Sequence, residues 1–129
     1  MRTGWVTDTR YLDHDTGAGH PERPDRIRAI HEAVEASGLP EELVALKPRP
    51  AEMEHLLTVH EKDYLNRLSA ACKTGARFID VPDSAICPDS YDVARLSGGA
   101  GLVACDAVIA GQIDNAFCAV RPPGHHCEV

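Results

Sequence analysis

Apolar residues recur along this chain at the spacings that distinguish helices from strands. Ile27, Ile30 and Val34 stand three and four residues apart, which predicts an amphipathic helix that begins in the proline-bearing turn at 21–24 and stops at Gly38. The same reasoning predicts four shorter elements, namely strands over 3–8 and 43–46 and helices over 51–59 and 61–71.

The longest periodic segment spans residues 90–110 and predicts a long helix. Gly98, Gly99 and Gly101 lie in its middle, and each glycine costs about 1 kcal/mol relative to alanine in a helix interior. Three glycines together therefore predict that another backbone approaches this helix closely.

Two segments that flank this helix indicate the architecture. Residues 74–88 have no helical period and contain one glycine and two prolines, which predicts a long surface loop of the kind that often carries function. Residues 115–120 are nearly all apolar, as in strands that are buried on both faces of a parallel sheet. A helix followed by such a strand predicts an α/β fold, and no linker or repeat divides residues 1–129 into several domains.

The composition of the chain argues against several classes of function. The 129 residues are 43% hydrophobic and 26% charged, as is typical of a globular domain. Twenty acidic residues against thirteen Lys and Arg give a formal charge of -7, so we expect no nucleic-acid partner. No run approaches the roughly 20 apolar residues of a membrane span, and the first ten residues lack the apolar core of a signal peptide. We therefore expect a cytoplasmic protein without membrane contact.

The five cysteines are an odd number at wide spacings, without a Cys-x-x-Cys pair. This pattern fits reduced thiols in a cytosolic protein. Cys105 and Cys118 lie in apolar runs and are interpreted as small buried core residues.

The apolar strand at 115–120 is followed directly by the sequence Arg-Pro-Pro-Gly-His-His at 121–126. Loops at the carboxyl ends of strands hold the ligand chemistry in open α/β sheets. The prolines restrict the backbone, and Gly124 allows a conformation or a close contact that a side chain would forbid. Histidine side chains in general exchange protons near neutral pH, so a His125–His126 pair is suited to transfer protons to and from a hydrolytic water.

Other interpretations of the histidines remain open. A His-His pair in a loop is often a solvated surface feature. Alternatively, four consecutive residues could share a metal ion, although such neighbours seldom reach one ion in tetrahedral geometry. These residues are His125, His126, Cys127 and Glu128. Upstream, Arg23 and Arg26 are interpreted as surface or ion-pairing residues, and His60 as a helix-end histidine rather than a ligand.

Five segments match a known family in the order of that family: 3–8, 20–27, 56–60 with Tyr64, 83–91 and 121–126. They resemble the histone deacetylase superfamily, in particular its class II branch with bacterial acetoin-utilisation and acetylpolyamine deacetylases. The similarity covers nearly the whole chain. Cys127 departs from the small residue, often alanine, that usually follows the histidine pair.

This resemblance implies an α/β domain of the arginase and deacetylase type, with a central parallel sheet flanked by helices and a zinc ion at the strand ends. His126 corresponds to the histidine that acts as general base and then general acid, and His125 corresponds to its partner. Asp83 corresponds to a loop aspartate that accepts hydrogen bonds from substrate amides, and Gly124 is assigned to the substrate side of the same site. The implied substrate is an acetylated lysine-like amine or a small acetylated polyamine.

The zinc ligands of the family have no counterpart in this sequence. In the family the ligands are an Asp-x-His pair and a further aspartate. These ligands, and a tyrosine that is not a ligand, follow the histidine pair in the sequence. Here no Asp-x-His pair occurs, and all three tyrosines precede His125. We therefore expect residues 1–129 to be the N-terminal portion of a zinc-dependent deacetylase domain, inactive alone and self-associating as a homo-oligomer. The competing hypothesis is a non-enzymatic binding or assembly module derived from the same fold.

Overall fold

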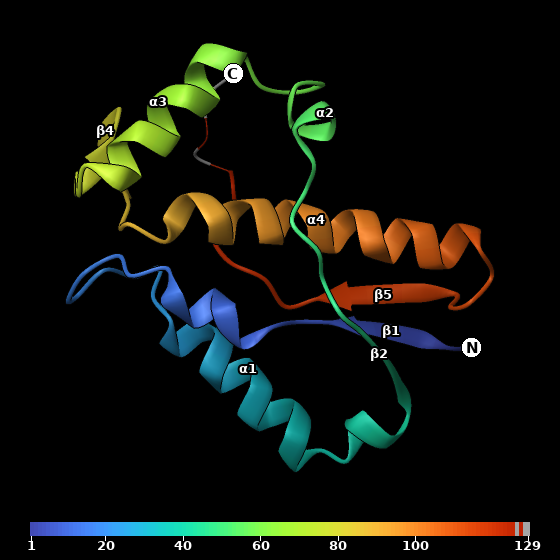
Figure 1. The fold of residues 1–129 in the computed structure, drawn as a ribbon. Coiled ribbons are helices and arrows are strands. Elements are labelled where there is room, and N and C mark those ends of the chain that lie inside the picture. The colour runs from blue at the N-terminus through green and yellow to red at the C-terminus, as the bar shows by residue number, and fades with distance from the viewer. Residues whose placement is uncertain (126, 128–129) are drawn as a thin grey trace.

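Three short parallel strands form the centre of the fold, in the order β2-β1-β5 (Figure 1). The computed structural model describes residues 1–125 and 127. In the register of the sheet, Gly4 lies opposite Val44 on one side and Ala116 on the other. The elements in chain order are β1 (Thr3–Val6), η1 (Thr9–Asp13, a 3-10 helix), α1 (Asp25–Ala36), η2 (Leu39–Glu41, also 3-10), β2 (Leu43–Leu46), α2 (Met53–Leu56), α3 (Lys62–Lys73), β3 (Phe78–Ile79), β4 (Val81–Ala85), α4 (Ser90–Ile109) and β5 (Asn115–Cys118).

The helices α1 and α4 lie on opposite faces of this sheet (Figure 1). Because side chains alternate along a strand, neighbouring residues of β1 contact different helices. Val6 is fully buried and packs with Ala100 of α4, whereas the Trp5 ring makes an edge contact with His31 of α1. The expected α/β architecture with a parallel sheet and flanking helices is confirmed.

The close backbone approach predicted for the glycine-rich helix occurs at Gly99. A Cβ atom at this position would lie 1.6 Å from the carbonyl oxygen of Arg49, because the chain after β2 crosses α4 there. The Ala51 N–H donates to the Arg95 carbonyl at 2.8 Å, and the Arg95 guanidinium donates to the Ala51 carbonyl at 3.0 and 3.1 Å. At the other two glycines of the helix, a Cβ would meet only ordinary contact or open space, so the prediction holds for Gly99 only.

The expected long loop at 74–88 is wrong, because it contains the antiparallel hairpin of β3 and β4. Its turn is a single residue, Asp80, whose φ of 57° lies in the left-handed region that aspartate tolerates better than most residues. Arg67 of α3 donates to the Asp80 carboxylate at 2.6 Å and holds the turn. A hairpin with so short a turn and with Pro82 in its second strand lacks the sequence signals of common hairpins.

Burial along β5 also differs from the expectation. β5 is an edge strand of the described sheet, and Phe117, which stacks on Trp5 with ring centroids 5.7 Å apart, is 55% exposed. The strand is therefore not buried on both faces among the described residues. Cys105 is exposed on α4, whose inward face is formed by alanines such as Ala104. Cys118, at the end of β5, is only half-buried.

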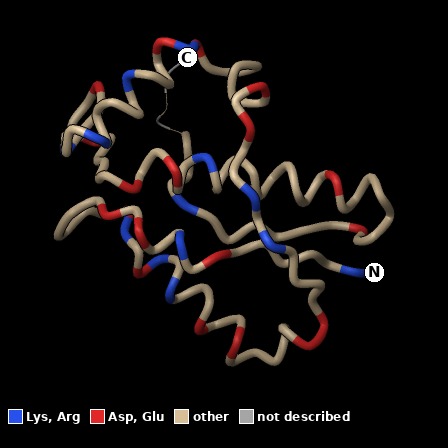
Figure 2. The backbone as a smooth tube through the Cα atoms, viewed as in Figure 1, with Lys and Arg blue, Asp and Glu red and all other residues tan. Residues whose placement is uncertain are grey.

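Two further observations concern the surface. Acidic and basic residues alternate around the start of α1 (Figure 2), where Arg23 lies 3.4 Å from Asp25 and Arg26 lies 3.2 Å from Glu22. Both arginines are about half-exposed, which confirms them as surface, ion-pairing residues.

Across the residues that the structure describes, no helix combines the length and apolar character that a bilayer crossing requires.

Candidate functional site

The loops that follow β1 and β5 meet at one edge of the sheet. The strand order β2-β1-β5 means that the chain adds β2 on one side of β1 and β5 on the other. Ligands of open α/β sheets bind outside the carboxyl ends of the strands at such a switch point, here between β1 and β5. The segment at 121–125 is thereby placed beside the loop at 14–24.

Arg121 joins these two loops. Its side chain is fully buried and forms two hydrogen bonds to the Glu22 carboxylate, from Nε at 3.0 Å and from Nη2 at 2.8 Å. Its Nη1 donates to the carbonyl oxygens of Tyr11, at 2.9 Å, and of His14. A buried arginine needs partners for its charge and for its donors, and the loop after β1 supplies them. Arg121 thus fixes the start of the segment that leads to His125.

Glu22 is held in its ionised form by this arrangement. Burial acts to raise the pKa of Glu22, but the hydrogen bonds and the charge of Arg121 outweigh it, so the pKa lies below its ordinary value. The bidentate geometry is the strong form of an arginine–carboxylate pair. In the sequence, Glu22 and Arg121 stand out only as members of two motifs. The feature that could have indicated their pairing is Arg121 itself, a charged residue directly after an apolar strand that needs a buried partner.

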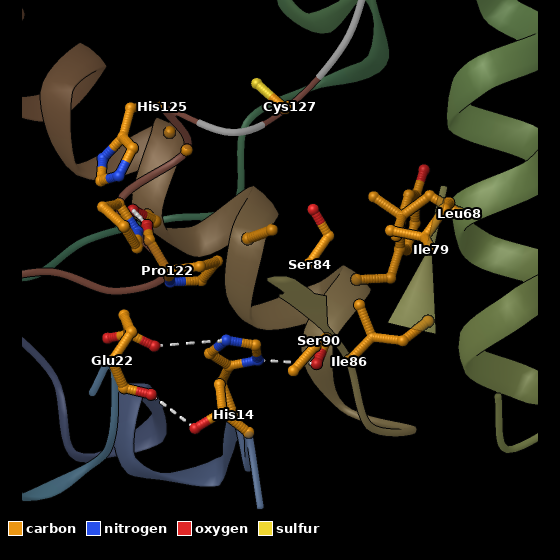
Figure 3. Close-up of a pocket in the computed structure, with 18 of the residues that line it drawn as sticks. His14, Glu22, Leu68, Ile79, Ser84, Ile86, Ser90, Pro122, His125 and Cys127 are labelled. Atoms are coloured by element: carbon orange, nitrogen blue, oxygen red, sulfur yellow. Dashed lines mark hydrogen bonds and ion pairs between the residues drawn. The ribbon is translucent and has the colours of Figure 1, made fainter. Parts of the chain in front are cut away.

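His14 forms the floor of the site and was not singled out from the sequence. The residue is 3% exposed, with Nδ1 at 2.7 Å from the Ser90 hydroxyl and Nε2 at 3.6 Å from Glu22 (Figure 3). Burial, reinforced by the charge of Arg121 and opposed by Glu22, lowers the pKa of His14 from 6.5 to about 4. His14 is therefore neutral at physiological pH.

Above this floor lies a pocket of about 850 Å³ (Figure 3), a volume within the usual range for small-molecule sites. Apolar side chains of α3 and of the hairpin region form one wall, including Leu68, Ile79 and Ile86. The pocket also brings together residues from distant parts of the sequence that were expected to act together, namely Asp83, Gly124 and His125, and Cys127 lines it as well.

The individual site residues are placed as follows. Asp83 lies in β4 with its side chain 66% exposed, and its carboxylate is 3.9 Å from Nε2 of His20. Gly124 has a φ of 82°, and a Cβ atom there would meet nothing within 4 Å, so the glycine serves conformation rather than a close contact. His125 is exposed and lines the pocket. The expected general base His126 lies outside the described residues.

The described residues do not fit a zinc ion. Across residues 1–125 and 127, no three His, Cys, Asp or Glu side chains are grouped so that they could hold a metal. His14, which is the buried histidine of the site, is already engaged with Ser90 and Glu22. The alternative cluster of four consecutive residues includes His126 and Glu128, which lie outside the described residues.

Comparison with known proteins gives a consistent family. The family sequence model of the histone deacetylase domain matches residues 20–129. The histone deacetylase-like amidohydrolase of Pseudomonas aeruginosa is 41% identical over 124 residues, covering 96% of this chain and 31% of that protein. A probable deacetylase of Archaeoglobus fulgidus is 35% identical over 130 residues, covering 99% of this chain and 36% of that protein. The human polyamine deacetylase HDAC10 is 33% identical over 126 residues, which cover 94% of this chain and 19% of that protein.

A solved structure shows the same fold. The crystal structure of the HDA15 HD domain superimposes with a TM-score of 0.89 at 30% sequence identity, covering 100% of this chain and 38% of that chain. The chain thus spans roughly a third of the length of the first two relatives and of this structural neighbour.

Proposed function

The chain belongs to the histone deacetylase family, and from this premise we propose that it supplies the proton-transfer and substrate-binding loops of a deacetylase, an amide hydrolase acting on N-acetylated amines. The observation that supports the proposal most strongly is the pocket at the carboxyl ends of β1 and β5. Segments from three parts of the chain meet there and bring His125 and Asp83 to the same cavity.

Each residue has a proposed role that follows from its chemistry. His126 takes a proton from the attacking water and returns it to the leaving amine, with His125 as its partner. Asp83 accepts a hydrogen bond from an amide N–H of the substrate, because an exposed carboxylate in the pocket wall is an acceptor of that kind. Arg121, bonded to Glu22, keeps the histidine segment in place.

We further propose that the full enzyme is zinc-dependent. Its metal ligands would lie in the part of the domain that the longer relatives contain and residues 1–129 do not. This proposal is supported by the family resemblance and by the fact that the chain covers only 31% and 36% of the length of two relatives. The substrate class is proposed as acetyl-lysine-like amines or acetylated polyamines.

A second candidate is a binding or assembly module without hydrolytic activity. It is favoured by the lack of a three-residue metal cluster within the described part of the chain. The reading frame past the codon for Val129 discriminates the two. An Asp-x-His pair in a strand context supports the enzyme, and an immediate natural stop supports the module.

The activity test uses the protein that this reading frame encodes, loaded with zinc, on an acetyl-lysine peptide and on an acetylated polyamine. We expect release of acetate from at least one of them. We also expect Asp83→Asn to lower kcat/KM on the peptide by roughly tenfold, as for the loss of one hydrogen bond to a charged group. Absence of hydrolysis with both substrates at full zinc occupancy would contradict the proposal.

A further inference from the structure

We propose that His20 is a positioning residue for Asp83: its ring Nε2–H holds the Asp83 carboxylate in the orientation that receives a substrate amide. This inference rests on the proposed function and extends it to a residue that does not touch the reacting atoms. The two side chains come from different parts of the fold, because His20 belongs to the loop after η1 and Asp83 to β4. Both line the same pocket.

The hydrogen bonds around His20 determine which ring nitrogen carries the proton. The Glu22 backbone N–H, which can only donate, points at Nδ1 of His20 at 3.1 Å. The Glu22 carbonyl also lies 3.0 Å from Nδ1, but a hydrogen on Nδ1 would take the acceptor away from the Glu22 N–H. Nδ1 is therefore the acceptor, and the neutral ring has its hydrogen on Nε2.

The Nε2–H has a specific acceptor within reach. Nε2 is buried and has no hydrogen-bond partner among the described residues, and an unsatisfied buried donor is costly. The Asp83 carboxylate is the charged acceptor beside it, at 3.9 Å. This distance exceeds a normal N–H···O distance of about 2.9 Å by about 1 Å.

The hairpin that carries Asp83 can close this gap. It is a two-stranded unit separate from the main sheet, and isolated two-stranded hairpins are only marginally stable. Its turn is held to α3 by the Arg67–Asp80 pair. His20, by contrast, is fixed within its own loop by the bond from Glu22. A small shift of β4 toward His20 forms the hydrogen bond and orients the carboxylate.

The first test is the tautomer of His20 in the 129-residue chain. Long-range ¹H–¹⁵N correlation spectra at a pH where the ring is neutral should show the hydrogen on Nε2 and a bare Nδ1. Asp83→Asn should shift the His20 Nε2 resonance, while Asp89→Asn serves as the matched control and should not. A ring with its hydrogen on Nδ1, or an Nε2 resonance that ignores Asp83→Asn, would overturn the proposal. This test requires no enzyme activity, so it decides the matter even if the proposed function fails.

The second test separates positioning from folding in the zinc-loaded protein encoded by the full reading frame. His20→Asn keeps an oxygen near the position of Nδ1, which can accept the Glu22 N–H as in an Asx-turn, but removes the donor to Asp83. His20→Gln keeps an N–H near the position of Nε2. We expect His20→Asn to lower kcat/KM on an acetyl-lysine peptide by roughly tenfold, the loss typical of one charge-assisted hydrogen bond, and His20→Gln to restore part of it.

Two controls make the kinetic result specific. His20→Asn combined with Asp83→Asn should lose no more activity than Asp83→Asn alone, because the two residues act as one unit. A peptide N-methylated at the amide that Asp83 receives should be hydrolysed equally by the wild type and by His20→Asn. Additive losses, or an equal loss on the methylated peptide, would show that His20 acts only through the fold of its loop.

Discussion

The crossing of the chain over α4 at Gly99 leads to a quantitative prediction. In Gly99→Ala the new Cβ would lie 1.6 Å from the Arg49 carbonyl oxygen and 2.8 Å from the Ala51 nitrogen. Real Cβ contacts below 3.0 Å are essentially never seen, so the crossing segment has to withdraw by about 1.4 Å. Both close atoms belong to backbone, which cannot rotate away as a flexible side chain could.

The energetic cost follows from the bonds that the withdrawal breaks. Three hydrogen bonds join Ala51 to Arg95, and each contributes about 1 kcal/mol, or about 3 kcal/mol in total. Alanine is better than glycine in a helix by about 1 kcal/mol. We therefore expect Gly99→Ala to lower the free energy of unfolding by about 2 kcal/mol, a large fraction of the roughly 5–15 kcal/mol of a typical domain.

Urea denaturation followed by circular dichroism measures this change. Gly101→Ala is the matched control, since it lies two residues along the same helix and a Cβ there meets nothing within 4 Å. Gly101→Ala should raise the free energy of unfolding by about 0.5–1 kcal/mol. If the two variants changed stability in the same direction and by similar amounts, the crossing contact would not have the importance assigned to it.

Three further predictions concern the chain of 129 residues. The pKa of His14 falls from 6.5 to about 4 on folding, so as the pH falls the unfolded state is protonated before the folded state is. The free energy of unfolding should therefore decline as pH falls from about 6.5 to about 4. His14→Gln should flatten this part of the pH profile. Metal analysis after dialysis, with an acetyl-lysine reporter, should find neither stoichiometric zinc nor turnover, and zinc with turnover would contradict the ligand assignment. Size-exclusion chromatography with light scattering should show concentration-dependent self-association through the open edge of β5 and the exposed Phe117, whereas a sharp, concentration-independent monomer would refute it.

Local periodicity predicted most of the elements. The helix with Ile27 and Ile30 and the long glycine-rich helix are found because their apolar residues recur at helical spacing. The strand at Leu43–Leu46 is found as a short apolar run before a proline-bearing break. The hairpin was missed because its turn depends on Asp80 in a left-handed conformation and on Arg67 from another helix. Neither condition is visible in the local pattern.

The candidate site was predictable in part. The loop after β5 lines the pocket together with Asp83, as expected for a motif that follows an apolar strand, and the catalytic role of the loop stays a prediction. The buried network behind it was not predicted, since the pairing of Arg121 with Glu22 joins residues 99 positions apart and depends on the sheet order. His14 was missed for the same reason, because a histidine in a polar loop shows no local sign of burial.

The role proposed for the loop at 121–126 is that it carries the proton-transfer groups of a deacetylase. It is tested most directly by measuring kcat for an acetyl-lysine peptide with the zinc-loaded protein encoded by the full reading frame, as wild type and as His126→Ala. We expect His126→Ala to lower kcat by roughly 10²- to 10⁴-fold with a smaller change in KM, as for the loss of general acid–base catalysis. A kcat near the wild-type value, in a variant that still binds zinc and folds, would contradict the assignment.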